Sequence, residues 1–536
     1  MNSFFLKAGT LALVASVSLA GCGGGGTTDL AAANNATAGT GTAAIASPQP
    51  TITGGSANNA PPEPTPTSTP ISFPTSDLTA AGSPAAGLQD YGTALRPFTP
   101  LAKPAKGVRF TDPDFPGTKI VRVTDAKADF NSRVALPAYP TTQAWNADET
   151  LMILYVSGAL SEGGRNGTFA LYDGKTYKFL DYLDINPADV EQFYWSTTDP
   201  SALFYVDNNQ RTGTQQNALT KMTVNYSGGA VTTRTTVLHD FAADFKPGGA
   251  LHDAVQGAGL ITRVSGGSDP FGMSWDNDLI GLGAYLNRNT PRGGAAYAAF
   301  TYRISTGQIG KSFIPDDSTV PQALPSGKGT YFYENEQQVQ IRDPLTNAVL
   351  QTRSFDGSQH GDLLLNAAGE DVVVSVQFDS PFNKAMMTMN LTQGGSPKVL
   401  IDHDPVSGSF ASGRAFKAPG WVGISMVGCP SGSNGNCNGG QPIAVGSPMT
   451  YLDQEILLAN VDTGKVYRVA HHRSTGNYFN APQSNYWAQP NITISPSGTR
   501  MLFQSDWGDA NPSKPVIDAS SIVDTYVIEL PSYRGK

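Results

Sequence analysis

Ile494-Ser495-Pro496-Ser497-Gly498-Thr499-Arg500-Met501-Leu502-Phe503 is the stretch of this chain that reveals most about its fold. A strand end, a tight turn built on Pro and Gly, and a second apolar strand follow one another along it. Degenerate copies recur upstream, each with a turn-rich segment that leads into an apolar run. Their turns begin at Trp145, Trp195, Trp275, Pro325, Asn366 and Pro419. A unit that repeats every ~40–80 residues predicts a β-propeller with loop insertions.

A second signature, an Asp/Gly turn between two strands, follows most copies, as in Leu171–Lys175, Ile304–Gly307 and Asn460–Tyr467. One copy of each signature makes a four-stranded unit. The sequence therefore predicts an all-β fold, a single propeller of about seven four-stranded blades, with one blade more or fewer still open. A helical solenoid is excluded because no stretch of useful length shows a 3.6-residue apolar period. A two-sheet sandwich would not repeat one motif pair in this way.

The two ends of the predicted propeller supply partners that can close its ring. Lys119–Val123 and Thr525–Leu530 are both short β-rich runs. Propellers close by mixing strands from the two ends of the chain, so we expect these runs to pair in one blade.

The N-terminus has the features of a bacterial lipoprotein signal. Lys7 precedes the apolar run Ala8–Leu19, which is too short to span a bilayer permanently. The following Leu19–Cys22 resembles the lipobox, in which the cysteine is lipidated after cleavage. The alternative is an ordinary signal with an incidental cysteine. Gly23, where an inner-membrane retention signal usually has Asp, favours lipid anchoring in the outer membrane, at its periplasmic face or at the cell surface.

Composition divides the chain into a signal with lipobox at 1–22, a tether at 23–94 and the propeller at 95–536. The tether consists mainly of Gly, Ala, Thr, Ser, Asn and Pro. Such a segment buries too little apolar surface to offset its ordering entropy, so we expect it to be disordered.

The remaining cysteines and the net charge restrict the partners. Cys429 and Cys437 bracket a turn-rich stretch, and in an exported protein such a pair usually forms a disulfide; a metal or redox site is the alternative. The net charge of −9 argues against nucleic-acid binding, which needs a clustered basic face. No Gly-x-Ser-x-Gly, P-loop, His-Glu-x-x-His, Cys-x-x-Cys-His or EF-hand motif occurs.

Polar residues precede the repeat turns of several blades. They are Gln143, Gln192, His360, Lys417 and Gln489. Residues just before the innermost strand line one mouth of a propeller channel, so we predict a polar funnel there. The alternative is that such positions are polar simply because the channel is wet.

The densest group of candidate side chains lies near the end of the chain. It comprises His471, His472, Arg473, Tyr486, Trp487, Gln489 and Asn491. Aromatic rings cover sugar faces, amides bind hydroxyl groups, and an arginine can bind a carboxylate bidentately. We predict that His360, His471 and His472 lie near the channel. Ordinary structural hydrogen bonding is the alternative.

The Ser-Pro-Ser-Gly repeat resembles those of TolB-type, WD40-like propellers, and the last blades resemble oligogalacturonate lyases and, more loosely, propeller-type ulvan lyases. The oligogalacturonate lyase family binds a divalent metal through a histidine-rich strand, which here reads Gln489-Pro490-Asn491. Amides are poor ligands for manganese-like ions, so no metal or other cofactor is predicted, although a divalent metal stays open. For a metal-free β-elimination, His360 or His471 would be the base, Arg473 would neutralise the uronate, and Tyr486 would be the acid.

Two functions remain in competition at this point. The first is an envelope propeller that binds, and perhaps cleaves, an acidic polysaccharide or oligosaccharide. The second is a non-catalytic, TolB-like scaffold for envelope proteins. Convergence of His360, His471, Arg473 and Tyr486 on one pocket would favour the first.

Overall fold

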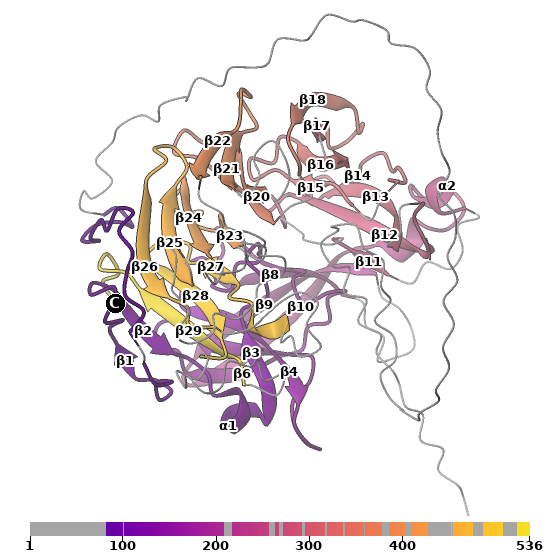
Figure 1. Cartoon of the computed structure of the whole chain (residues 1–536). Helices are drawn as coiled ribbons and strands as arrows, with labels where there is room; N and C mark the ends of the chain where they lie inside the picture. Colours follow the sequence, from indigo (N-terminus) through magenta and orange to yellow (C-terminus); the bar gives the residue numbers. More distant parts are fainter. Residues whose placement is uncertain are drawn as a thin grey trace, which may run out of the picture.

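The structure is a computed structural model. It describes residues 82–99, 101–207, 217–256, 263–266, 272–291, 295–316, 319–335, 338–357, 360–377, 385–402, 410–426, 452, 454–474, 486–507 and 522–535. The strands in these ranges form seven antiparallel sheets arranged in succession around a ring (Figure 1). Six sheets have four strands and one has five. The predicted seven-bladed propeller is confirmed.

Blade 1 consists of β3 (Ser132–Leu136), β4 (Leu151–Ala159), β5 (Thr168–Asp173) and β6 (Phe179–Leu183). Blade 2 consists of β7 (Phe193–Trp195), β8 (Ala202–Asp207), β9 (Ala218–Ser227) and β10 (Ala230–Asp240). Blade 3 consists of β11 (Val264–Ser265), β12 (Leu279–Asn289), β13 (Ala295–Arg303) and β14 (Gln308–Ile309). Blade 4 consists of β15 (Gln322–Ala323), β16 (Thr330–Asn335), β17 (Gln338–Arg342) and β18 (Val349–Ser354).

Blade 5 consists of β19 (Gly361–Leu365), β20 (Asp371–Gln377), β21 (Ala385–Asn390) and β22 (Lys398–Ile401). Blade 6 consists of β23 (Phe410–Ser412), β24 (Trp421–Ser425), β25 (Glu455–Asn460) and β26 (Val466–His471). Blade 7 consists of β27 (Ile492–Ile494), β28 (Arg500–Ser505), β29 (Asp524–Glu529), β2 (Lys119–Arg122) and β1 (Arg109–Phe110). The short helices α1 (Ala126–Phe130), η1 (Phe241–Ala243), α2 (His252–Val255) and η2 (Tyr486–Ala488) lie in connections between blades.

The first strand of each blade lies on the inside of the ring, where β19, β23 and β27 contact one another. The last strands lie outside, and β10 and β18 are largely exposed. We call the side of the ring with the turns between first and second strands the turn face. The side on which the first strands begin is the strand-start face.

Blade 7 closes the ring as the sequence predicted. β2 pairs with β29 in an antiparallel register that runs from Lys119 opposite Glu529 to Arg122 opposite Tyr526. β1, which was not predicted, adds a fifth strand outside β2. Residues from the two ends of the chain thus share one sheet.

The repeated turn has a local cause in the Ser-Pro-Ser-Gly stretch. The Ser495 amide donates to the Arg500 carbonyl over 2.9 Å, and the Gly498 amide donates to the Ser495 carbonyl over 2.9 Å. Gly498 has φ +72°, and a Cβ there would lie 2.9 Å from Pro84. Only glycine satisfies both conditions without strain.

Hydrogen bonds from these turns join neighbouring blades on the turn face. In each case a main-chain amide of one turn donates to a polar side chain of the next blade. The pairs are Thr197 with Asn277, Ser326 with Asp371, Ala367 with Asp462 and Ser497 with Glu149. The repeat seen in the sequence therefore also fastens blade to blade.

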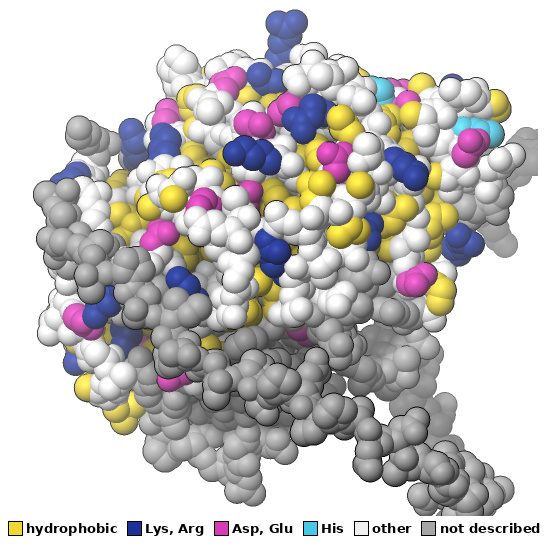
Figure 2. Space-filling view, turned by 90° about the horizontal axis from the view of Figure 1, so that it is seen from above, with side chains coloured by type: hydrophobic (Ala, Val, Ile, Leu, Met, Phe, Trp, Pro, Cys, Tyr) yellow, Lys and Arg dark blue, Asp and Glu magenta, His cyan; other side chains and the backbone are white. Residues whose placement is uncertain are grey.

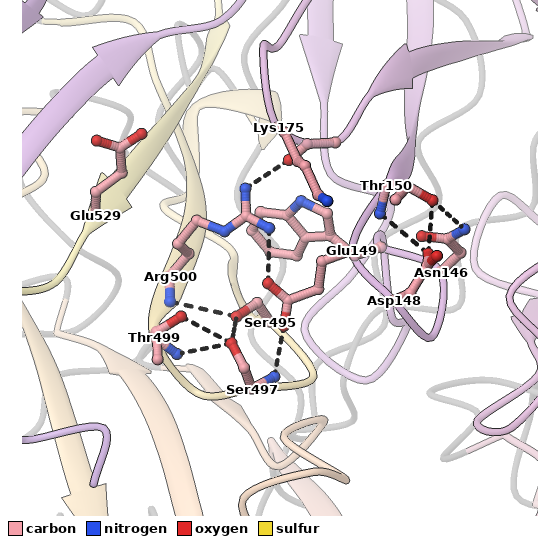
Figure 3. A network of polar contacts seen from close by, with 12 residues as sticks. Asn146, Asp148, Glu149, Thr150, Lys175, Ser495, Ser497, Thr499, Arg500 and Glu529 are labelled. Carbon is pink, nitrogen blue, oxygen red and sulfur yellow. Dashed lines mark hydrogen bonds and ion pairs between the residues drawn. The ribbon is translucent and has the colours of Figure 1, made fainter. Parts of the chain in front are cut away.

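An ion pair at the closing boundary strengthens this contact between blades 7 and 1 (Figure 3). Arg500, which is almost fully buried, donates to Glu149 over 2.6 Å and to the Tyr177 hydroxyl over 3.2 Å. The Tyr177 hydroxyl donates to Glu529, which also pairs with Arg109 of β1. The guanidinium lies 5.1 Å from the Trp145 ring centroid. One arginine thus connects the first blade, the last blade and, through Glu529, the N-terminal strands.

Residues 82–99, which we call the strap, run along blade 6. Most of them had been predicted to belong to the disordered tether. Ala85 is fully buried, Lys465 pairs with Asp90, and Arg468 donates to the carbonyls of Gly92 and Ala94. The boundary predicted between residues 94 and 95 is therefore wrong, because the ordered part includes residues 82–94. The strap is held through carbonyls and small side chains, which composition does not reveal.

On the side of the molecule seen in Figure 2, basic and acidic side chains are intermixed with apolar ones. Among the described residues, no helix is both long and apolar enough to cross a membrane. Apolar cores lie between adjacent blades; one of them joins Ile456 and Leu458 of blade 6 to Ile494 and Phe503 of blade 7.

We predict that Glu149→Gln lowers the free energy of unfolding by about 3 kcal/mol, because it leaves the buried Arg500 charge without its carboxylate. Urea denaturation of the full chain measures the change. Glu162→Gln, at an exposed site, is the matched control and should have no effect. Equal stability of the two variants would contradict a closing role for Arg500.

Candidate functional site

The strand-start face carries several of the predicted polar residues. Gln192 immediately precedes β7, His360 immediately precedes β19, and Gln489 and Asn491 precede β27. Lys417 differs, since it lies between β23 and β24 on the turn face, where its amide donates to the Pro496 carbonyl. Its predicted place at the channel mouth with the others is wrong.

His360 belongs to an aromatic group that spans three blades. Its ring is stacked on Phe410 of blade 6, with centroids 4.7 Å apart and planes 11° apart. Tyr139 of blade 1 meets Phe410 edge-on at 6.1 Å. His360 and Tyr139 are only 7% and 9% exposed, so only a small part of either side chain is open to solvent.

Amide side chains lie at the starts of the inner strands of blades 2 and 7. Gln192 accepts a hydrogen bond from the Gly266 amide over 2.9 Å, which ties blade 2 to blade 3. Asn491 is 8% exposed, and its Oδ1 has no hydrogen-bond partner among the described residues. A buried amide oxygen without a partner is uncommon, and it is a natural acceptor for a ligand hydroxyl.

Further along the inner strands, polar side chains link blades across the ring. Gln143 donates to the carbonyls of Arg414 and Ile494, both over 2.9 Å. Arg414 forms a buried bidentate pair with Asp362 of blade 5. Burial raises the pKa of Asp362 to about 6, although Arg414 opposes this shift. Gln143 therefore joins blades 1, 6 and 7.

His471, His472 and Arg473 do not lie at the channel, and that part of the prediction is wrong. His471 ends β26, the outermost strand of blade 6, and His472 and Arg473 follow it directly. An outer strand is normally exposed, but here the strap and the β1–β2 connection cover it, and His471 is fully buried. The sequence could not show that another segment of the chain covers this strand.

His471 and Arg473 take part in an internal cluster of charges. His471 Nδ1 lies 3.3 Å from Asp114 Oδ2, and Arg473 Nη2 lies 3.2 Å from Asp112 Oδ1 and 3.4 Å from Asp114 Oδ2. Burial raises the pKa of Asp114, but the adjacent His471 side chain and the hydrogen bonds from Thr99 outweigh it and lower the pKa to about 2. The cluster fastens the N-terminal segment to blade 6.

The same three side chains, Asp112, Asp114 and His471, are close enough together to be tested as metal ligands, with donor atoms within 4.8 Å of one another. Arg473 already places its positive charge against both carboxylates. Thr99 donates to both oxygens of Asp114, and the His471 amide donates to Asp112. A divalent cation would have to displace these donors, so the residues do not fit a metal.

The remaining predicted residues either contact other parts of the protein or lie outside the described residues. His472 Nε2 lies 3.0 Å from the Met426 carbonyl, and its Nδ1 accepts from the Ser474 amide over 3.0 Å. Trp487 is half-buried, with its ring 6.2 Å from that of Tyr155. The Tyr486 side chain, Cys22, Cys429 and Cys437 lie outside the described residues.

The structure thus brings His471 and Arg473 together but places them at the outer edge of blade 6, whereas His360 lies at the inner strand of blade 5. Sequence reasoning missed Phe410, which stacks on His360, and Tyr139, which packs against Phe410. Tyr139 precedes the first repeat turn much as His360 precedes its own. That shared position is the signal by which it could have been found.

Comparisons with known proteins found similarity only at the level of structure. No protein-family model matches the chain, and no curated protein matches its sequence. An oligogalacturonate lyase in complex with manganese is similar in structure, with 12% identity, a TM-score of 0.47, and coverage of 79% of this chain and 96% of that one. An oligogalacturonate lyase from Vibrio parahaemolyticus has 14% identity, a TM-score of 0.44 and coverage of 79% and 96%. The WD40 domain of Neurospora crassa Pan2 has 10% identity, a TM-score of 0.37 and coverage of 76% and 97%. These likenesses concern the propeller fold alone.

Because the folded-state pKa of Asp114 is lowered, its contribution to stability is present above the ordinary value of 3.8 and is lost as the pH falls towards about 2. We predict that Asp114→Asn lowers the free energy of unfolding by about 2 kcal/mol at pH 6, and that this difference shrinks below pH ~4. Denaturant titrations of both proteins across this range measure it. Asp316→Asn, at an exposed site, is the control. If the difference in unfolding free energy between the two proteins did not depend on pH, the proposed stabilising role of the Asp114 charge would be contradicted.

Proposed function

We propose that this chain is a lipid-anchored envelope propeller that binds an acidic oligosaccharide or polysaccharide on its strand-start face and does not cleave it. The observation that carries the proposal is the group of His360, Phe410 and Asn491 at the starts of inner strands, with Tyr139, which follows β3, packed against Phe410. Aromatic rings and an acceptor without a protein partner are groups that the C–H bonds and hydroxyls of sugars contact.

The contrast between the two faces supports this choice of face. On the turn face, amides and carboxylates of neighbouring blades already satisfy one another. On the strand-start face, the buried Asn491 Oδ1 has no hydrogen-bond partner among the described residues. Binding groups are generally found where the scaffold leaves polar atoms to a ligand.

The placement of the candidate catalytic groups argues for binding without β-elimination. This reaction needs a base, a cation for the uronate and an acid within reach of one sugar. Arg473 is occupied by Asp112 and Asp114 beneath the N-terminal segment, and His471 is fully buried beside it. The alternative cation near the inner strands, Arg414, is paired with Asp362.

The proposed anchor is compatible with this face. Pro84 packs against the turn at Gly498, so the strap begins on the turn face. A lipid on Cys22, followed by the Gly- and Pro-rich segment, would therefore connect to the side opposite the proposed ligand. We propose the outer membrane as the location, on the basis of the lipobox and Gly23.

We predict that the full chain binds polygalacturonate, and that Asn491→Ala weakens binding about fivefold, the effect of one lost hydrogen bond. Calorimetry measures the affinity, and ultraviolet absorbance of the mixture detects any unsaturated uronate. Gln308→Ala, an exposed amide on the outer strand of blade 3, is the matched control.

Formation of unsaturated product would contradict the non-catalytic part of the proposal. No binding to any member of a panel of acidic and neutral polysaccharides would contradict the ligand class. If no polysaccharide binds and the full chain reproducibly pulls down an envelope protein, the scaffold function would be favoured.

A further inference from the structure

A cavity of about 670 Å³ lies on the strand-start face at the periphery of blade 3, apart from the inner strands. Three segments distant in sequence build it: the end of α2 with Gln256, the end of β12 with Arg288, and the connection from β14 to β15 with Lys311, Ser312, Phe313 and Ile314. None of these residues was singled out by the sequence.

The charged side of this cavity is unbalanced. Arg288 and Lys311 are both exposed, and neither has an acidic partner in the described part of the chain. The acid at the cavity, Asp253, lies 3.0 Å from His252 Nδ1, and its side chain is 99% exposed to water. Elsewhere acids and bases are intermixed, as Figure 2 shows for one side of the molecule. Two cations at one cavity therefore favour an anionic ligand.

The apolar side of the cavity is rigid. Phe313 exchanges two main-chain hydrogen bonds with Ala299, of 2.7 and 3.0 Å, and its ring packs edge-on against Phe332 at 5.1 Å. The Arg342 guanidinium lies 4.8 Å from the Phe313 ring centroid. Ile314 next to it is 42% exposed, which is unusual for a large apolar side chain. An apolar group of a ligand would gain contact area there without rearrangement of the protein.

We infer that this cavity is a second binding site, which takes a small organic anion: a carboxylate or phosphate held by Arg288 and Lys311 and carried on a ring or short chain that covers Phe313 and Ile314. Gln256 and Ser312 can donate further hydrogen bonds to the anion. The site is separate from the proposed oligosaccharide face near the inner strands and does not depend on it.

Calorimetry with the full chain tests the inference, using phenyl phosphate, benzoate, inorganic phosphate and neutral glucose as probes. We expect one-to-one binding of phenyl phosphate, benzoate or both, at least tenfold tighter than inorganic phosphate, because the ring adds buried apolar area. If only one of phenyl phosphate and benzoate binds, the result shows whether the site takes a phosphate or a carboxylate. Glucose should not bind.

Variants separate the two sides of the cavity. Arg288→Ala or Lys311→Ala should weaken ring-anion binding at least tenfold, whereas Arg234→Ala, an exposed cation on β10, should not change it. Ile314→Ser should weaken the binding of phenyl phosphate but should leave the binding of inorganic phosphate unchanged. Binding that is unchanged in Arg288→Ala and Lys311→Ala, or absent for all three anions with a normally folded protein, would overturn the inference. Loss of polygalacturonate binding alone would not affect it.

Discussion

The closing of the ring in blade 7 is the constraint on which the rest of the structure depends. β2 brings residues from the start of the chain into the sheet that contains its end, and Arg500 pairs with Glu149 across the same boundary. Each blade buries its apolar surface only against two neighbours, so an open ring would leave two such surfaces in water. Glu529 accepts a hydrogen bond from Tyr177 and pairs with Arg109, and these contacts connect the same boundary to β1.

Closure gives the two faces different chemistry. The turn face is used for assembly, because amides such as that of Ser497 donate to carboxylates such as Glu149 in the next blade. The strand-start face carries the ends of the strands, where Asn491 and the cavity beside Arg288 leave polar groups without protein partners. The strap and the β1–β2 connection form a third region, in which Arg473 and His471 hold Asp112 and Asp114 against the outer strand β26. The proposed binding and the proposed anchoring thus fall on different parts of the ring.

The sequence was informative where structure is local and misleading where it is not. The turn at Ser495–Arg500 and its copies follow from Pro, Gly and adjacent apolar residues, so the blades could be predicted. The β2–β29 pairing is not local, and it could be predicted only because a propeller closes with strands from both of its ends. His471 and Arg473 were misplaced, because a polar strand end at the channel and one covered by Asp112 and Asp114 look alike in sequence. The cavity at Lys311 could not be predicted, because three distant segments form it.

The central claim is that ligand binds on the strand-start face and that the turn face serves assembly. Hydrogen exchange of the full chain, with and without polygalacturonate, tests it most directly. The account predicts slower exchange at the starts of the inner strands, around residues 360–363 and 489–493, and no change in the turn at 495–500. Protection confined to the turns, or to the strap against β26, would contradict it.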